Sequence, residues 1–159
     1  MSSSAPGPEL LGTRLRHLLD QLDGDVAAVY ADRGLEWFRP RYAPVVRELA
    51  ASGPSSIRDL ARATGVTHSA ASQTVAQMVK EGLVVLEPGA DARSRIARPT
   101  PKAEALLPVL DAESAATTAA AAELEAELGY PLSRLVGEAL DALARRPMRR
   151  RIADAMMDT

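Results

Sequence analysis

The chain has 159 residues, no cysteine and a net charge of −2. The lack of cysteine excludes disulfides and thiol-based redox sensing, and the lack of any apolar run of about 18 residues excludes a membrane span. Hydrophobic residues make up 47% of the sequence but aromatic residues only 3%, which favours packed helices over a β-sandwich. The sequence begins without the basic and apolar regions of a signal peptide, and the lack of cysteine makes a reducing cytoplasm the expected compartment.

The first predicted element is a long amphipathic helix. Leucine and valine recur at spacings of three and four from Pro8 to about Ala31, which is the period of a helix with one apolar face. Gly34, Pro40 and Pro44 interrupt this pattern. A second helix is predicted over residues 44–51, before the loop sequence SGPSS.

The next segment, "SIRDLARATGVTHSAASQTVAQMVKEGLV", predicts a helix-turn-helix. A short helix from Ile57 ends at Gly65, and a second helix follows with Thr67 as its N-cap. Gly82 is expected to close the second helix as the residue after its C-cap. We expect one stripe of this helix to be buried, formed by Ala71, Val75, Met78 and Val79.

A β-hairpin is predicted directly after the helix-turn-helix. "LVVL" is typical of a strand, "EPGADA" of a turn and "RSRIAR" of a returning strand, with the hairpin tip at about 88–92. Residues 57–100 are also the only third of the chain with more basic than acidic residues. Arg93 and Arg95 share one face of the returning strand, and we expect Asp91 to hold the Arg93 guanidinium in an extended position.

The remaining sequence is predicted to be helical. Thr100 and Pro101 are suited to the N-cap and first position of a long helix, which passes Pro108 and ends at "GYP". Two further helices are predicted at about 132–145 and 148–157. Because the helices at both ends carry leucine stripes without a partner in so small a domain, we expect a homodimer.

The fold class predicted is mainly α with a small β-hairpin wing, a winged helix-turn-helix domain plus a helical dimerisation region. The predicted segments are a disordered lead (1–8), an N-terminal dimerisation helix and hinge (9–44), the winged helix-turn-helix domain (45–100) and C-terminal dimerisation helices (101–159).

The predicted DNA-binding residues lie on the second helix of the helix-turn-helix and on the wing. The outward face of this helix is polar and nearly uncharged, which suits hydrogen bonding to base edges in the major groove, although a solvated face has the same composition. An arginine at the wing tip suits a narrow minor groove. The candidates are Thr67, His68, Ser69, Ser72, Gln73, Gln77, Lys80, Asp91, Arg93 and Arg95.

Two further clusters have more than one interpretation. Tyr30, Trp37, Phe38 and Tyr42 lie near Arg39 and Arg41, so they form either a pocket for a planar acid or a local core that anchors a helix crossing. The "RRPMRRR" segment at 145–151 is either a rim that meets DNA phosphate or acids of a partner subunit, or a solvated helix end.

Catalytic, metal and cofactor sites are not expected. The two histidines, His17 and His68, lie on different elements and have no second ligand at metal-binding spacing. No phosphate-binding glycine loop or nucleophile-elbow motif occurs, so we do not expect an enzyme.

From Ile57 to Ala103 the sequence resembles the MarR family of bacterial winged helix-turn-helix regulators. The resemblance includes the D-x-R wing motif at Asp91 and Arg93 and the threonine that starts the next helix at Thr100. It implies a nucleoid-associated homodimer that represses transcription from a near-palindromic double-stranded DNA operator and is released by a small aromatic or anionic effector. The chain departs from the family at Pro99 (usually Leu), at Ala103 (often Gly) and at Val85-Leu86, which replace basic residues.

The predicted function is therefore a sequence-specific DNA-binding transcriptional regulator. The alternative is a winged-helix module that uses the same surface to bind protein and does not read DNA. The missing basic residues after "GLV" and the nearly neutral total charge keep this alternative open.

Overall fold

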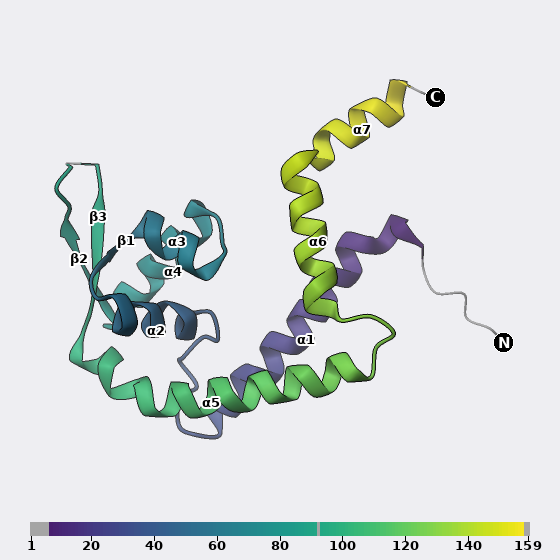
Figure 1. The fold of residues 1–159 in the computed structure, drawn as a ribbon. Helices are drawn as coiled ribbons and strands as arrows, with labels where there is room; N and C mark the ends of the chain where they lie inside the picture. Colours follow the sequence, from purple (N-terminus) through teal and green to yellow (C-terminus); the bar gives the residue numbers. More distant parts are fainter. Residues whose placement is uncertain (1–6, 92, 158–159) are drawn as a thin grey trace. The chain divides into compact units, whose positions relative to one another are not determined.

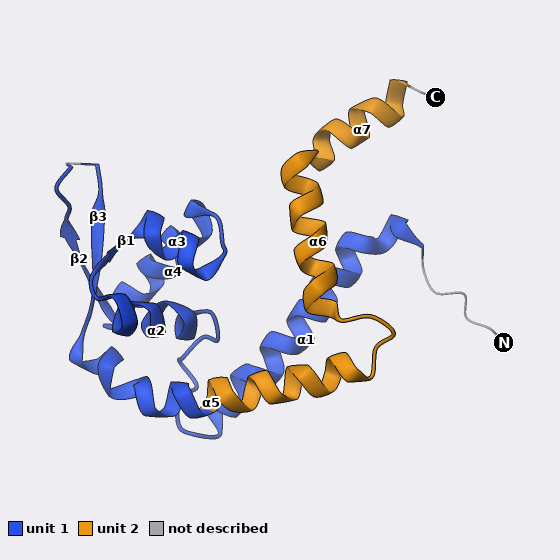
Figure 2. Ribbon diagram, in the orientation of Figure 1, with its two compact units in different colours: residues 1–112 blue, residues 113–159 orange. Residues whose placement is uncertain are grey.

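A computed structural model describes residues 7–91 and 93–157 of the chain. The chain forms two compact units, residues 1–112 and 113–159 (Figure 2). The division falls inside one continuous helix, α5 (Pro101–Ala126), and not between elements. The predicted fold class, mainly α with a small β-hairpin wing, is confirmed.

The first unit contains most of the elements (Figure 1). A 3-10 helix (Pro8–Leu10) leads into α1, so Pro8 belongs to a helix and not to the predicted lead. Residues 1–6 of that lead lie outside the described residues. The other elements are α1 (Leu11–Ala31), α2 (Tyr42–Ser52), β1 (Ser55–Ser56), α3 (Ile57–Thr64), α4 (His68–Lys80), β2 (Val84–Pro88), β3 (Arg95–Pro99) and the start of α5.

The helix-turn-helix formed by α3 and α4 has the predicted capping residues. Gly65 ends α3 in the left-handed conformation (φ 68°), which a glycine adopts without strain. The Thr67 hydroxyl accepts a hydrogen bond from the Ala70 amide at 3.1 Å, so Thr67 is the N-cap of α4. Gly82 follows the C-cap residue Glu81 with φ 72°, and the Leu83 amide donates to the Met78 carbonyl at 2.9 Å.

The wing belongs to a three-stranded antiparallel sheet with the order β1-β3-β2. Strand β1 was not predicted, because its sequence, Ser55–Ser56, reads as a loop and forms only two pairs with β3. Strand β3 is therefore the central strand, and Pro99 is its last residue. The Thr100 amide donates to the carbonyl of Leu83, the residue before β2, so the nitrogen of the preceding Pro99 faces the other side, beyond the end of β1.

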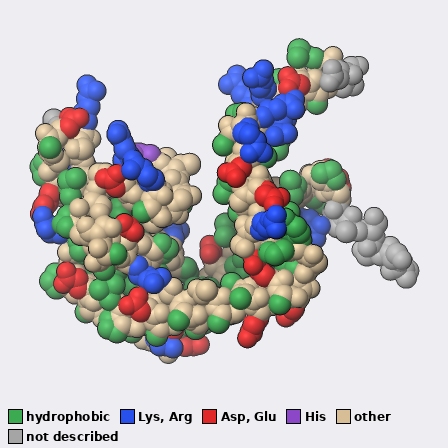
Figure 3. Space-filling view, viewed as in Figure 1, with side chains coloured by type: hydrophobic (Ala, Val, Ile, Leu, Met, Phe, Trp, Pro, Cys, Tyr) green, Lys and Arg blue, Asp and Glu red, His purple; other side chains and the backbone are tan. Residues whose placement is uncertain are grey.

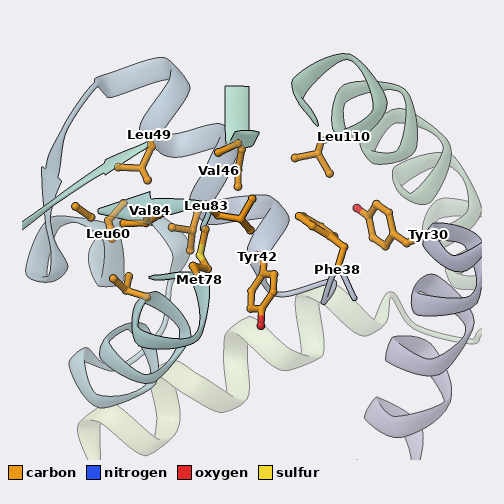
Figure 4. Packing of buried hydrophobic residues seen from close by; sticks show 14 residues of the cluster. Tyr30, Phe38, Tyr42, Val46, Leu49, Leu60, Met78, Leu83, Val84 and Leu110 are labelled. Atoms are coloured by element: carbon orange, nitrogen blue, oxygen red, sulfur yellow. The ribbon is translucent and has the colours of Figure 1, made fainter. Parts of the chain in front are cut away.

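A single hydrophobic core holds the first unit together (Figure 4). Leu60, Val75, Met78, Leu83 and Leu110 are fully buried in it. These residues come from α3, α4, the start of the wing and α5, so the core fixes the helix-turn-helix against the sheet.

The expected burial of Val79 is wrong. Its side chain is 38% exposed, because it lies about 100° around α4 from Met78 and so leaves the stripe that Ala71, Val75 and Met78 form. The start of the second helix also differs: α2 begins at Tyr42, two residues before Pro44. Proline is tolerated in the first turn, where its missing N–H has no helical partner.

The second unit consists of the rest of α5, α6 (Leu132–Arg145) and α7 (Met148–Met157), and the last two helices have the predicted bounds. Helix α5 continues through Pro108. In the single chain several large apolar side chains of α6 and α7 are exposed: Leu135, Val136, Leu140, Leu143, Met148 and Ile152. Among the described helices, none combines the length and the hydropathy that crossing a bilayer requires.

Candidate nucleic-acid interface

A groove of roughly 610 Å³ lies between the helix-turn-helix and the wing. His68 and Ser72 line it from α4, and Arg93 and Arg95 line it from the wing. Basic side chains gather over this part of the first unit in Figure 3. The groove brings together five of the predicted DNA-binding residues, namely His68, Ser72, Asp91, Arg93 and Arg95.

Two arginines of this groove were not identified from the sequence. Arg58 and Arg62 lie four residues apart on α3, so they share one helix face and line the groove together with the wing. Arg62 forms an exposed ion pair with Asp59 at 3.7 Å. The four-residue spacing of Arg58 and Arg62 on the first helix of the helix-turn-helix was the sequence signal that could have identified them. The two arginines add two cations to the surface of the groove.

The wing tip is held by hydrogen bonds between its own residues. The Ser94 amide and hydroxyl both donate to the Asp91 carbonyl at 2.9 Å, and the Gly89 amide donates to the Ser94 carbonyl at 2.9 Å. The Asp91 carboxylate accepts from the Arg93 backbone amide at 3.2 Å. Asp91 therefore fixes Arg93 through the backbone and not through the expected guanidinium pair, so the Arg93 side chain stays available.

The two strands of the wing are joined by an ion pair farther from the tip. The Arg98 guanidinium donates to both carboxylate oxygens of Glu87 at 3.0 Å. This bidentate hydrogen bond lowers the pKa of the Glu87 carboxyl and raises the pKa of Arg98. Arg98 is thereby neutralised within the wing, whereas Arg93 and Arg95 are not in an ion pair among the described residues.

The exposed polar face of α4 continues beyond the groove. Thr67, Ser69, Gln73 and Lys80 are exposed on it, as the sequence predicted. Gln77 differs from them. Its amide oxygen accepts hydrogen bonds from the Arg41 guanidinium and, at 3.5 Å, from the Tyr42 hydroxyl, so the side chain is directed toward the start of α2.

The aromatic cluster between α1 and α2 lies largely in the core. Tyr30, Phe38 and Tyr42 are buried, and their rings pack tilted or edge-on with centroids 4.9 and 5.6 Å apart. Trp37 is partly buried and contacts Phe38 edge-on. Arg39 and Arg41 are exposed beside this cluster. The packing favours the interpretation as a local core that anchors the helix crossing, with Trp37 at its margin.

Two arginines of the arginine-rich segment in the second unit, Arg146 and Arg151, have a structural role. The Arg151 guanidinium donates to the carbonyls of Ala142 and Arg146 at 3.2 and 3.0 Å, which caps the end of α6. Arg146 forms an ion pair with Asp154 of α7. These contacts fix the corner between α6 and α7 and leave the exposed side chains of Arg145, Arg149 and Arg150 on its surface.

No group of three metal-binding side chains occurs within residues 7–91 and 93–157. The groove instead offers guanidinium groups, hydroxyls and an imidazole around an open surface. These groups bind phosphates and base edges by charge and by hydrogen bonding.

The comparisons with known proteins agree with the geometry of this groove. A family model described as the MarR family matches residues 38–94, which include α2, the helix-turn-helix and the tip of the wing. No curated protein sequence gives a significant match to the chain.

Several solved structures share the fold. The regulator MosR of M. tuberculosis, solved in complex with DNA, has a TM-score of 0.64 and 23% identity, over 84% of this chain and 96% of that chain. The regulator PcaV of Streptomyces coelicolor, solved in complex with its natural ligand, has a TM-score of 0.61 and 17% identity, over 92% and 99%. A MarR-family regulator from Neisseria meningitidis has a TM-score of 0.55 and 20% identity, over 92% and 96%.

The family match covers the groove residues of α3, α4 and the wing tip but ends before Arg95, and the shared fold extends over most of the chain. The sequence motif at Asp91 and Arg93 lies at the tip of the wing. Over residues 38–94 this chain is therefore similar to the MarR family, and its fold is that of a winged helix-turn-helix protein.

Proposed function

We propose that this protein is a transcriptional regulator that binds duplex DNA through α4 and the wing. The observation that carries the proposal is the groove in which Arg58 and Arg62 of α3 face Arg93 and Arg95 of the wing beside the start of α4. The guanidinium groups on both sides of this protein groove are suited to bind the phosphate backbone of DNA. The polar face of α4 is suited to bind base edges in the DNA major groove. The DNA complex of MosR, which has the same fold, supports this binding mode.

The proposed regulator is a homodimer. Apolar side chains are exposed on α1 and on α6, including Leu15, Leu19, Leu135 and Leu140, and a second copy is the partner that would cover them. Two copies related by a two-fold axis would place two α4 helices in successive major grooves. The operator should then be nearly palindromic, with half-sites about one helical turn apart.

The proposed mode of control is repression that a small aromatic or anionic molecule relieves. Trp37 lies at the margin of the buried aromatic cluster, next to the exposed Arg39 and Arg41, where a planar acid would find both a ring and a cation. PcaV, which shares the fold, was solved with a natural ligand. Benzoate that quenches Trp37 emission should therefore weaken operator binding over the same concentration range. Quenching without any loss of DNA affinity would contradict this mode of control.

The experiment that tests the function is selection of bound fragments from a randomised duplex library, followed by gel-shift titration of the enriched sequence. We expect a near-palindromic motif that is bound far more tightly than a scrambled duplex of the same length. Binding that is equal for both duplexes, or absent, would contradict sequence-specific regulation. A result of that kind would favour the alternative, a winged-helix module that binds protein.

A further inference from the structure

The C-terminal end of α4 is held by the first residues of α5. The Thr100 hydroxyl donates to the Gly82 carbonyl at 2.6 Å, and the Lys102 ammonium donates to the Glu81 carbonyl at 2.7 Å. Glu81 is the C-cap of α4, and its carbonyl belongs to the group that a helix leaves without intrahelical partners. A cation at this place also interacts favourably with the negative end of the helix dipole.

Lys102 contacts a second element at the same time. Its ammonium lies 4.1 Å from the centroid of the Trp37 ring, in cation–π geometry. Trp37 precedes α2 and packs edge-on against Phe38, which is 1% exposed in the core. One side chain therefore links α5, the end of α4 and the junction between α1 and α2.

A second contact joins the same junction to the same turn of α4. The Arg41 guanidinium donates to the amide oxygen of Gln77, four residues before Glu81. The last turn of α4 is thus held at Gln77 by Arg41 and at Glu81 by Lys102, and both cations lie against aromatic rings of the junction.

We propose that Lys102 is a positioning residue that sets the placement of α4 for DNA binding without contacting DNA itself. This inference rests on the proposed function. Lys102 acts at the C-terminal end of α4, about 20 Å along the helix from His68 at its start, because each residue adds 1.5 Å. Its ammonium is directed to a backbone carbonyl and a ring of the protein, and neither contact requires DNA.

The chain provides a matched control for this proposal. Lys80 and Lys102 are its only lysines, and Trp37 is its only tryptophan. Lys80 lies exposed on α4 and belongs to the predicted DNA-binding face. K80M therefore removes a positive charge from a candidate phosphate contact. K102M removes the same charge from the proposed positioning contact.

The first measurement is operator binding as a function of salt concentration, with the full-length K102M, K80M and K102R proteins. K102M should weaken binding about fivefold and leave the salt slope unchanged, because no phosphate contact is lost. K80M should lower the slope by about 1. K102R should retain most of the affinity, because a guanidinium also donates to a carbonyl and stacks on indole. A slope that falls in K102M as it does in K80M would overturn the proposal.

The second measurement does not depend on DNA. Amide hydrogen exchange at Glu81, Gly82 and Leu83 should accelerate about fivefold in K102M, because the end of α4 loses its tether, and should stay unchanged at Ala97 in β3. The Trp37 emission maximum should shift in K102M and not in K80M. Exchange and emission that match the wild-type protein would overturn the positioning role. If the wild-type protein selects no DNA, the proposed function fails, and these two readouts still decide whether Lys102 fixes α4.

Discussion

The Arg98 guanidinium donates two hydrogen bonds, each of 3.0 Å, to the Glu87 carboxylate across the two strands of the wing. The register places Glu87 opposite Ile96 and Arg98 opposite Val85, so the pair is diagonal and not directly opposite. It lies between the core end of the hairpin and the tip that carries Arg93. The pair therefore connects the strands of a hairpin that is too small to be stable by its own backbone pairing.

The pH dependence of this pair follows from the direction of the shift. Hydrogen bonding to Arg98 lowers the pKa of Glu87 in the folded protein. A lowered pKa adds stability that is present above the unfolded value of about 4.3 and is lost as the pH falls through the folded value. NMR titration of the Glu87 carboxyl carbon should give a midpoint below 4.3, and R98Q should raise it. R95Q, on the same strand, should leave it in place. A midpoint that R98Q does not move would contradict the pairing.

Gly89 is predicted to be required at the wing tip because of Ser94. A Cβ atom at position 89 would lie 2.0 Å from the Ser94 hydroxyl oxygen and 3.3 Å from its backbone oxygen. G89A should therefore disturb the tip and lower the free energy of unfolding by about 1–3 kcal/mol, the usual cost of overpacking. Denaturant unfolding measures this loss, and G89A/S94A should recover part of it because the closest atom is removed. Equal stability of G89A and the wild-type protein would show that the tip adapts.

Gln73 and Gln77 are predicted to have different roles although both lie on α4. Gln73 is exposed, whereas Gln77 is bonded to Arg41 and Tyr42. Q73A should change the preferred base at one operator position by about 1–3 kcal/mol of discrimination. Q77A should weaken binding to all sequences alike and lower thermal stability. Selection from a randomised duplex library with both variants distinguishes these outcomes, and a changed motif in Q77A would contradict its role inside the protein.

The elements with strong local signals could be predicted from the sequence. Thr67 and Gly82 bound α4 through a hydroxyl cap and a left-handed glycine, which depend only on neighbouring residues. The bounds of α6 follow in the same way from the turn sequence before it and the proline after Arg146. Strand β1 could not be predicted, because its two serines become a strand only by pairing with residues about 40 positions later.

The residues of the candidate site could also be predicted only where the signal was local in the sequence. Arg93 and Arg95 were identified because they alternate in the sequence of the predicted returning strand, which is a local pattern, although β3 begins at Arg95 and Arg93 lies in the turn before it. Arg58 and Arg62 were missed, because their four-residue spacing indicates a shared helix face but not that this face meets the wing. The partners of Gln77 were missed for a similar reason: Arg41 is 36 residues away in the sequence and meets Gln77 only in the folded chain. Tertiary contacts therefore decide which polar residues of α4 remain exposed.

The arginines of the groove should differ from the exposed Arg150 in their effect on DNA binding. R58Q, R62Q and R93Q each remove a guanidinium that lines the groove, so each should weaken operator binding and lower the salt slope by about 1. Gel-shift titrations at several salt concentrations measure both quantities. Arg150, exposed on α7, provides the control, and R150Q should change neither quantity. A salt slope that stays at the wild-type value in all three groove variants would contradict the proposed phosphate contacts.

Dimer formation is predicted to depend on one face of α6. Leu140 is 59% exposed in the single chain and shares a helix face with Val136 and Leu143, whereas Asp141 points to the opposite face. L140K and D141K introduce the same side chain at neighbouring positions. L140K should raise the dimer dissociation constant by at least about 100-fold, since each of the two subunits loses the burial of a leucine side chain, which contributes about 1.5–3 kcal/mol. D141K should leave the constant near the wild-type value, and sedimentation equilibrium over a range of concentrations measures all three proteins. Because both substitutions are exposed in the single chain, circular dichroism should show equal helix content. A dissociation constant that is the same for L140K and D141K would mean that this face of α6 is not the dimer interface.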